Sequence, residues 1–499
     1  MSLSTDPLAK IEADSEAFRD HIGTITAQGK RAWVYAKKPK GRFYRWRSLV
    51  GYLLLFLMFA GPYVRLHGQP LLLLNVLENK YIIFGFVFWP QDFYLAVLGI
   101  LSLVLTITLF TSVFGRIWCG WTCPQTVFLE MLFRKIEYAI EGDFQQQKAL
   151  AASPWNANKI LRKGIKIAVF YALSFAIANT FLAYIIGSEA LWQIIREPIS
   201  QHVVGFLTIN AFSIVFFLVF ARFREQVCQF ACPYGRLQSA LVDNDTISVT
   251  YDFVRGENRG TLGTRKKAAK AMQTDIVSGA NLGASSSFGD CIDCGACVVV
   301  CPAAIDIRNG IQLECIQCTA CIDACDKMMD AVGKPRGLIR YTSYNNVLAS
   351  KDKTHKPQRR FPIKLRIVGY MALWFLLVSV FSYLILAREN IETVLLRQPG
   401  MLAHEMPDGA VGNLYTLKFF NKTFDDQNVE LKLANGEGEI RLIDPLDKIE
   451  AQKVVEVRLF IALKKENIKG GSMPLSIEVW SNGKKVNTRS TTFISTGGI

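Results

Sequence analysis

The chain has 499 residues, of which 51% belong to the apolar set, and it carries a formal net charge of +15. The apolar share is high for a soluble globular protein and predicts a membrane protein with soluble parts. The basic residues flank the apolar stretches instead of forming a separate patch, so the charge favours a membrane topology and argues against a nucleic-acid partner.

Residues 1–46 are interpreted as a basic cytoplasmic segment before the first apolar stretch. They open without a signal-peptide pattern, so we expect the first span to remain as an anchor. Residues 30–47 contain eight basic side chains and no acidic one. Basic residues beside a span stay on the cytoplasmic side, which predicts a cytoplasmic N-terminus.

Five apolar stretches are long enough to cross a bilayer, which takes about 20 residues. Their uncharged cores are Ser48–Val64, Phe93–Gly115, Ile167–Ser188, Val203–Ala221 and Ile367–Ala387. We predict a four-helix membrane domain over residues 47–235 and a fifth transmembrane helix over residues 363–388. A shorter apolar run, residues 81–91, ends in Trp89-Pro90 and is expected to be an interfacial or re-entrant piece.

The loops between the spans repeat the charge bias. Residues 66–92 and 189–202 are nearly free of Lys and Arg, so we assign them to the outer side. Five spans then place residues 222–362 in the cytoplasm and residues 389–499 in the periplasm of a bacterial inner-membrane, multi-pass protein. All 12 cysteines lie at or before Cys325, on the reducing side of this topology.

Two matched cysteine pairs follow the second and fourth spans. They are Cys119-Gly-Trp-Thr-Cys123-Pro124 and Cys228-Gln-Phe-Ala-Cys232-Pro233. If the helices continue, the i, i+4 spacing puts both thiols of a pair on one helix face, and the proline marks a helix end or a kink. The span pairs look like a parallel duplication, so both motifs should face each other at the cytoplasmic surface.

Four thiolates converging from two helices form a soft site suited to Cu(I), zinc or an iron–sulfur cluster. We favour transient binding and reduction of a thiophilic metal such as copper. Redox-active disulfides, a further iron–sulfur cluster and ordinary buried cysteines are the alternatives. After the first pair, a group of charged residues is expected to form the solvated face of an amphipathic helix. The group consists of Glu130, Arg134, Lys135, Glu137 and Glu141.

Residues 236–289 are expected to be a cytoplasmic linker, flexible and basic over residues 254–289. Residues 290–345 are predicted to be an inserted ferredoxin-like domain, because eight cysteines form two consecutive runs. The runs are Cys291-x2-Cys294-x2-Cys297-x3-Cys301-Pro302 and Cys315-x2-Cys318-x2-Cys321-x3-Cys325. In this bacterial ferredoxin pattern the fourth cysteine of each run binds the other cluster.

The crossed pattern assigns two [4Fe–4S] clusters. The ligands of the first are Cys291, Cys294, Cys297 and Cys325, and those of the second are Cys315, Cys318, Cys321 and Cys301. The alternative is a pair of structural zinc sites. Zinc would leave the third cysteine of each triplet without an obvious role.

Residues 389–499 change character and are expected to form an immunoglobulin-like β-sandwich. The expected strands are Asn413–Thr423, Val429–Leu433, Val454–Lys464, Leu475–Trp480 and Val486–Ile494, separated by turn signals. Met401, His404 and Met406 could offer soft ligands to Cu(I), although we favour a solvated linker there.

Several stretches together resemble the cytochrome c oxidase accessory proteins known as CcoG, FixG or RdxA. The stretches are residues 115–127, 136–142, 224–228, 232–236, 305–310 and 337–341. The likeness runs from about residue 30 to the C-terminus, and the motifs recur in the family's order. It implies a membrane polyferredoxin with an immunoglobulin-like outer domain, needed to assemble the cbb-type oxidase.

The resemblance also implies an activity, the reduction of Cu(II) to Cu(I). It further implies which residues of this sequence form the sites of the family. The thiols of the copper site would be Cys119, Cys123, Cys228 and Cys232, and the eight ferredoxin cysteines would be the cluster ligands. The expected partners are the membrane, a cytoplasmic electron donor, and a copper chaperone or oxidase assembly factors. A homo-oligomer stays open. A quinol-linked electron conduit and a non-enzymatic assembly scaffold are the alternative functions.

Overall fold

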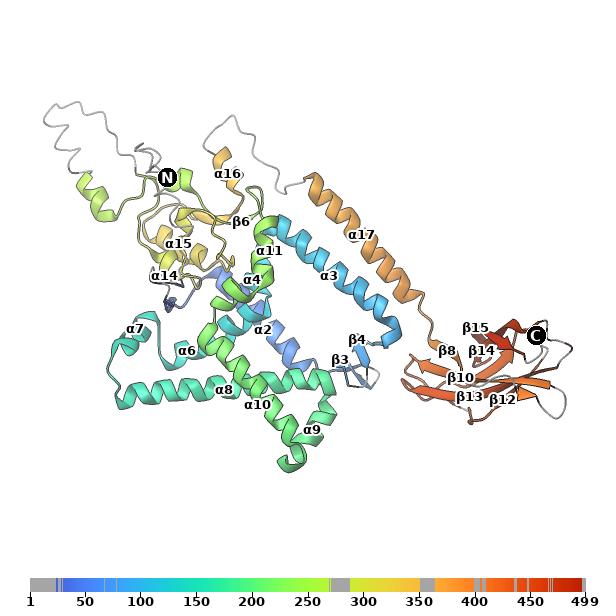
Figure 1. The fold of residues 1–499 in the computed structure, drawn as a ribbon. Helices are drawn as coiled ribbons and strands as arrows, with labels where there is room; N and C mark the ends of the chain where they lie inside the picture. The colour runs from blue at the N-terminus through green and yellow to red at the C-terminus, as the bar shows by residue number, and fades with distance from the viewer. Residues whose placement is uncertain are drawn as a thin grey trace, which may run out of the picture. The chain divides into compact units, whose positions relative to one another are not determined.

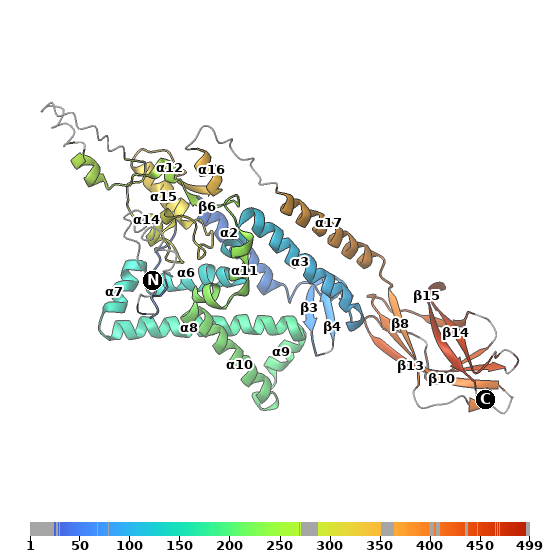
Figure 2. The ribbon, with the colours of Figure 1, turned by 45° about the horizontal axis from the view of Figure 1, so that its top comes forward.

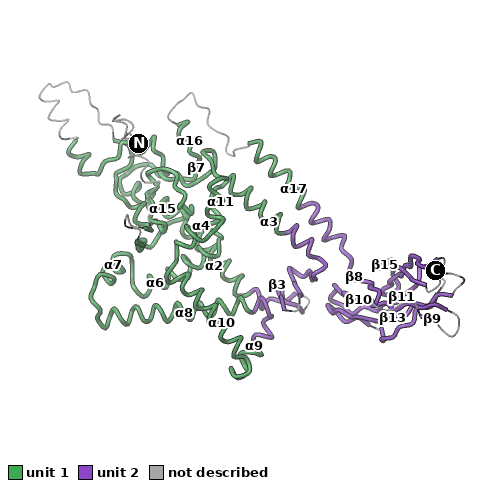
Figure 3. Tube along the Cα trace, in the orientation of Figure 1, with its two compact units in different colours: residues 1–60, 100–182, 192–377 green, residues 61–99, 183–191, 378–499 purple. Residues whose placement is uncertain are grey.

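The structure, a computed structural model, describes residues 24–25, 28, 30–66, 68–77, 79–268, 270, 288–350, 364–398, 404–405, 410–434, 438–446, 448–464, 466, 468 and 470–495. The chain divides into two compact units (Figure 3). Unit 1 comprises Met1–Ala60, Ile100–Leu182 and Trp192–Leu377, and unit 2 comprises Gly61–Gly99, Ala183–Leu191 and Val378–Ile499. The division runs through apolar helices, so both units contain parts of the membrane domain.

Among the described residues, five helices are long and apolar enough to cross a membrane (Figure 1). They are α2 (Arg42–Ala60), α3 (Phe93–Phe114), α8 (Ala157–Ile186), α10 (Val203–Leu218) with the π-helical turn η5 (Val219–Phe223), and α17 (Leu365–Leu386). Few of their side chains are buried inside the protein, as expected for helices whose apolar faces meet hydrocarbon. The prediction of five spans is confirmed.

Short helices follow the second and fourth spans and carry the cysteine pairs. After α3 come α4 (Ile117–Trp121), α5 (Pro124–Val127), the π-helical turn η3 (Phe128–Phe133), α6 (Arg134–Ile140) and α7 (Phe144–Ala152). After η5 come the π-helical turn η6 (Val227–Ala231) and α11 (Pro233–Leu241). Each proline is the first residue of a new helix, a position where its missing N–H costs nothing.

The ferredoxin domain is a small α/β unit in unit 1. Helices α14 (Ala296–Val299) and α15 (Ala320–Ala331) lie with strand β6 (Ser248–Tyr251) in one small domain (Figures 1 and 2). Strand β6 pairs antiparallel with β7 (Ile339–Thr342). Residues 248–251, expected within the linker 236–289, thus belong to this domain. The flexible stretch expected at 254–289 begins instead with α12 (Phe253–Gly256), and its residues 271–287 lie outside the described residues.

Helix α15 of the ferredoxin domain caps the first membrane helix. The carboxylate of Asp323 accepts hydrogen bonds from the backbone N–H groups of Phe43 at 3.1 Å and Tyr44 at 2.8 Å. These N–H groups belong to the first turn of α2, where no intrahelical acceptor exists. A Cβ at Gly41 would lie 2.1 Å from Cγ of Asp323, so this position has no room for a side chain. The cap fixes the ferredoxin domain to the start of α2.

Unit 2 contains a small sheet on the segment between the first two spans. Strands β3 (Leu72–Asn75), β4 (Lys80–Ile83) and β5 (Phe86–Phe88) form an antiparallel meander, followed by the short 3₁₀ turn η2 (Pro90–Asp92). The apolar run at 81–91, expected to be an interfacial or re-entrant piece, therefore forms two strands and a turn. Ile82 and Val87 alternate onto one buried face, which accounts for the apolar signal.

The C-terminal domain is a two-sheet sandwich, and the immunoglobulin-like prediction is confirmed. One sheet has the order β12-β13-β10-β8, with β9 paired to β10, and the other has the order β11-β14-β15. Their bounds are β8 (Ile391–Arg397), β9 (His404–Glu405), β10 (Ala410–Asn421), β11 (Val429–Leu433), β12 (Glu439–Leu442), β13 (Val454–Lys464), β14 (Ser472–Ser481) and β15 (Lys484–Ile494). The core between the sheets includes Tyr415, Leu459, Ile477 and Phe493.

All five expected strands are present, and the sequence reasoning missed β8, β9 and β12. Strand β8 follows the last span and is paired along its whole length with β10. Of the proposed soft ligands in this domain, His404 lies in β9, while Met401 and Met406 lie outside the described residues.

Candidate functional site

Each predicted ligand set lines one small cavity of the ferredoxin domain. Cys291, Cys294, Cys297 and Cys325 line the first cavity. Cys301, Cys315, Cys318 and Cys321 line the second, and Cys297 also reaches it. The structure thus gathers both predicted sets, including the crossed fourth cysteine of each run.

The two cysteine runs fold in the same way around their cavities. Asp293 and Gly295 of the first run have positive φ angles of 49° and 66°, and the equivalent residues of the second run, Gln317 and Thr319, have 53° and 64°. Left-handed residues turn a loop sharply and aim successive backbone N–H groups to one side. In the second run the β-branched residue Thr319 adopts this conformation, which favours glycine and is unfavourable for a residue with a side chain.

The walls of both cavities fit an iron–sulfur cubane. Apart from the thiols, they are lined mainly by apolar side chains such as Ile305, Ile307 and Leu338. Burial raises the pKa of Cys297 to about 11 and that of Cys325 to about 12, so metal binding must displace protons from these thiols. Among the described residues, no three His, Cys, Asp or Glu side chains are placed to hold a single metal ion. Thiols that surround a cavity favour a cluster over the zinc alternative.

The cysteine pairs do not lie on continuous helices, so the condition for a shared helix face is not met, and each motif marks a helix end as the prolines predicted. Cys119 lies in α4, whereas Cys123 is the extended residue before α5. Cys228 lies in η6, and Cys232 is the extended residue before α11. Each proline ends one helix and starts the next, so the two thiols of a pair belong to different elements.

The four thiols nevertheless lie near one another, although no three of them are placed to hold a single metal ion among the described residues. Burial raises the pKa of Cys119 to about 12, and the neighbouring Cys123 and Cys232 raise it further against the opposing charge of Arg116. Burial also raises the pKa of Cys228 to about 12, and the other three thiols add to the effect. Each thiol therefore lies within the electrostatic reach of the others, as expected for two motifs that face each other.

Helix α11 supports this group of thiols. Sγ of Cys119 donates a hydrogen bond to Oε1 of Gln238 at 3.7 Å, and Gln238 is 2% exposed. Arg116 donates to the carbonyl oxygen of Gly235 at 3.3 Å. Since Gln238 and Gly235 follow the second pair and Arg116 precedes the first, these contacts join the two motifs.

The first cysteine pair packs directly on a loop of the ferredoxin domain. A Cβ added to Gly120 would lie 2.3 Å from the carbonyl oxygen of Ile316 and 3.1 Å from the backbone nitrogen of Cys318. Gly115, with a φ of 61°, has equally little room beside the side chain of Gln317. The segment around Cys119 is therefore in van der Waals contact with the loop that carries ligands of the second predicted cluster. Nothing in the sequence pattern identified this contact.

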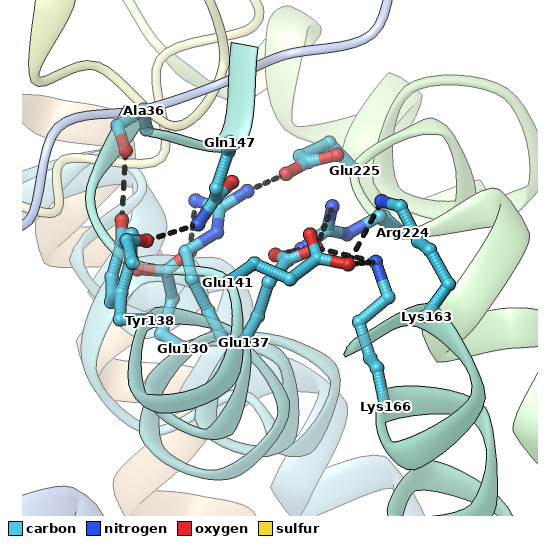
Figure 4. Close-up of polar contacts among 12 residues, drawn as sticks. Ala36, Glu130, Glu137, Tyr138, Glu141, Gln147, Lys163, Lys166, Arg224 and Glu225 are labelled. Carbon is cyan, nitrogen blue, oxygen red and sulfur yellow. Dashed lines mark hydrogen bonds and ion pairs between the residues drawn. The ribbon is translucent and has the colours of Figure 1, made fainter. Parts of the chain in front are cut away.

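The charged helix after the first pair is buried, not solvated as predicted, and its side chains meet charges on other elements (Figure 4). Glu130, Arg134, Glu137 and Glu141 are exposed by only 6%, 3%, 3% and 1%. Lys135 alone is partly exposed, with Nζ 2.8 Å from the hydroxyl of Tyr52. The i, i+4 charge pattern suits a solvated face, but it suits equally a face that meets charges on other elements.

Those other charges come from the second motif and from α8. Arg134 is paired with Glu130 at 2.6 Å and with Glu225, which follows Arg224 before the second cysteine pair. On the other side, Lys163 and Lys166 of α8 each lie 2.8 Å from Oε1 of Glu141. The network joins the segment after the first cysteine pair, the segment before the second pair and α8, and removing one member would leave a buried charge unpaired.

Three family models match segments of the chain. Residues 96–140 match a family described as a 4Fe-4S binding domain, residues 223–344 match a 4Fe-4S dicluster domain, and residues 381–496 match an IG-like fold at the C-terminus of FixG. The first match contains Cys119 and Cys123, and the second contains the other ten cysteines.

Similar proteins match over most of the chain. The nitrogen fixation protein FixG of Rhizobium meliloti is 31% identical over 486 residues, which cover 87% of each chain. Protein RdxA of Cereibacter sphaeroides is 33% identical and covers 82% of this chain and 83% of its own. Protein RdxB of the same organism is 33% identical and covers 83% and 84%. This chain therefore belongs to the FixG/RdxA family and is an iron–sulfur redox protein of a membrane.

Proposed function

We propose that this protein passes single electrons from a cytoplasmic donor through its ferredoxin domain to the four thiols of the two cysteine pairs, where Cu(II) is reduced to Cu(I). The observation that carries the proposal is the contact of Gly120 with Ile316 and Cys318. At Gly120 the segment of the first cysteine pair is so close to a ligand loop of the second predicted cluster that no side chain fits between them.

The residues also suggest an order of transfer. Cys297 lines both cavities, so the two cluster sites adjoin each other. The loop that touches the first cysteine pair carries Cys318 of the second set, and Cys297, a member of the first set, lines both cavities and so connects the two sites. When bound, the two [4Fe–4S] clusters supply one-electron storage and transfer. The chain holds these sites in contact and covers them with apolar side chains that exclude water.

The four thiols suit copper as the substrate. Thiolates are soft ligands and stabilise Cu(I) relative to Cu(II), so they favour the reduced product. The electrons balance, because each Cu(II) gains one electron and the ferredoxin domain loses one. Burial raises the pKa of Cys119 and Cys228 to about 12, so these thiols release protons as copper binds.

The proposal includes the membrane orientation and the partners that were expected from the sequence. The N-terminus and the ferredoxin domain would be cytoplasmic, and the β-sandwich would be periplasmic. Cu(I) would pass to a copper chaperone or to assembly factors of a cbb-type oxidase. In the quinol-linked and scaffold alternatives the protein would hold the same clusters but would not turn over copper.

A second candidate is a further iron–sulfur cluster at the four thiols. The match of residues 96–140 to a 4Fe-4S binding domain favours it, because that match contains Cys119 and Cys123. Electron transfer would then end on a third cluster. Iron analysis of anaerobically purified protein distinguishes the two, since two clusters give about eight irons per chain and three give about twelve.

The test of copper reduction uses single cysteine variants under anaerobic conditions. Cys119→Ser and Cys228→Ser should retain the iron content and the visible absorbance of the wild type but fail to form a Cu(I)–chelator complex. Cys294→Ser is the matched control, because it should lose iron. If the first two variants reduced Cu(II) at the wild-type rate, the four thiols would not be the site of reduction.

A further inference from the structure

A groove with a cavity volume of about 570 Å³ opens on the ferredoxin domain. One wall is residues 40–43, which lead into α2, and the other consists of one face of α15 and residues 336–341. We call it the basic groove. Ile339 lines both the groove and the cavity of the first cysteine set. A single layer of side chains therefore separates the groove from the cluster site that lies farther from the cysteine pairs.

The helix α15 provides a second connection between the groove and that site. Asp326 lines the groove and directly follows Cys325, a predicted ligand of the first cluster. Ile322, one turn earlier on α15, also lines the groove. An electron arriving in the groove would have to cross only the backbone of one residue or the side chain of Ile339.

The groove has an excess of positive charge. Its cationic lining residues are Lys40, Arg42, Lys327, Arg336 and Arg340, and its acidic ones are Asp323, Asp326 and Asp330. Every one of these carboxylates has a partner inside the protein. Asp323 caps α2, Asp326 accepts from the backbone N–H of Gly337 at 2.9 Å, and Asp330 is paired with Arg336 at 2.6 Å.

Several cationic side chains of the groove, unlike its three carboxylates, have no hydrogen-bond or ion-pair partner among the described residues. Lys40 and Lys327 are exposed and make no hydrogen bond or ion pair with the described part of the chain. Arg42 is exposed as well, and its guanidinium lies 5.1 Å from the ring centre of Phe43. These three charges lie on both walls, so they could contact a large anionic surface at several points.

We propose that the basic groove is the docking site of an acidic one-electron carrier protein, which rests on the electron-transfer function proposed above. The carrier would lose one electron, and the cluster that Cys291, Cys294, Cys297 and Cys325 would hold would accept it, with no bond formed. Complementary charge raises the rate of encounter and fixes the orientation of such partners.

The chemistry favours a protein carrier over a nicotinamide. A hydride donor delivers two electrons at once, whereas each cluster site accepts one, and a flavin would be needed to divide the pair. An anionic lipid headgroup is the other class of ligand that would suit Lys40 and Arg42, because both lie at the start of a membrane helix. The experiment below separates it from a carrier.

The test measures equilibrium binding of an oxidised, acidic plant-type [2Fe–2S] ferredoxin to the full-length protein in detergent. Lys40→Glu combined with Lys327→Glu reverses two charges in the groove. Lys266→Glu combined with Lys267→Glu is the matched control. Both lysines are exposed and belong to unit 1, as the groove does, but neither lines the groove. Iron content and visible absorbance verify that all proteins carry their clusters.

We expect the groove variant to bind the ferredoxin about tenfold more weakly at low ionic strength, and the control to bind within about twofold of the wild type. The difference should shrink as salt rises. Equal binding by the groove variant and the wild type, or equal loss in both variants, would overturn the proposal. A difference that appears only in vesicles containing anionic lipid, and not in detergent, would also overturn it in favour of a headgroup site.

Two kinetic measurements separate this inference from the copper proposal. Reduction of the clusters by reduced ferredoxin should be slower in the groove variant, whereas reduction by dithionite, which needs no docking surface, should be unchanged. Oxidation of the dithionite-reduced protein by Cu(II) should also be unchanged. Failure of the copper reaction in the wild type would reject the copper proposal. The binding and reduction measurements with ferredoxin would still test the docking proposal independently.

Discussion

Arg224 donates a hydrogen bond from Nη2 to Oε2 of Glu137 at 2.5 Å, and both side chains are almost completely buried. Arg224 lies four residues before Cys228, and Glu137 lies on α6 after the first cysteine pair. Arg224 also has a φ of 53°, a conformation that non-glycine residues rarely adopt. The ion pair therefore holds the two motifs together at a point where the backbone turns sharply.

Replacing Glu137 by Gln should destabilise the protein strongly. The substitution leaves the guanidinium of Arg224 buried without its counter-charge, which costs about 3–5 kcal/mol for broken buried pairs. Thermal unfolding in detergent would measure the effect. Glu189→Gln is the control, because its pair with Arg65 at 2.6 Å is largely exposed and should contribute little. Similar unfolding temperatures for both variants would contradict the role of the buried network.

The same pair predicts how stability depends on pH. Burial alone would raise the pKa of Glu137, but Arg224 and Lys166 outweigh it and lower that pKa from 4.5 to about 2. A carboxylate with a lowered pKa stabilises the fold above the unfolded value, and this stabilisation is lost as the pH falls from about 4.5 towards 2. The stability gap between wild type and Glu137→Gln should therefore narrow over that range. A gap that stays constant there would count against the lowered pKa.

Gly120→Ala should disturb the contact between the cysteine pair and the ferredoxin loop. The new methyl group would collide with the backbone of Ile316 and Cys318, which cannot move without displacing a predicted cluster ligand. We expect a lower unfolding temperature and a changed electron paramagnetic resonance signal from one of the two reduced clusters. Gly164→Ala is the control, because a Cβ there meets nothing within 4 Å. An unchanged spectrum in Gly120→Ala would refute the direct contact.

Asp92 should be needed for the stability of unit 2. Its carboxylate is 3% exposed, lies 2.7 Å from Nζ of Lys422 and is also paired with Arg388. Asp92→Asn removes the charge that two buried cations share, so limited proteolysis should cut the β-sandwich faster than in the wild type. Glu430→Gln, at the exposed pair with Lys432, should leave the rate unchanged. Equal rates for the two variants would show that the buried pairs do not hold this region.

The sequence predicted those features that repeat at fixed spacing. The crossed cysteine sets, the five spans and the strands β10, β11, β13, β14 and β15 all follow from periodicity or from motif spacing. The contact of Gly120 with Ile316 could not be predicted, because it joins residues almost 200 positions apart.

One feature was misread, and another was predicted only in part. An i, i+4 charge pattern fixes which face of a helix is polar but not whether water or another charged segment covers that face, so the burial of Glu137 and Glu141 was missed. Pro124 and Pro233 were predicted to mark a helix end or a kink, and each does. That each also begins a new helix was not predicted, because this depends on the contacts of the following turn.

The most direct test of the central claim is a single-turnover measurement with Cu(II). Protein reduced by dithionite and freed of excess reductant is mixed anaerobically with Cu(II), and cluster absorbance and Cu(I) formation are followed together. We predict that one Cu(I) forms for each electron lost from the clusters. The variant with serine at positions 119, 123, 228 and 232 should retain its iron but react about a hundredfold more slowly, because copper is no longer held beside the ferredoxin loop. Reoxidation of that variant at the wild-type rate would contradict the account.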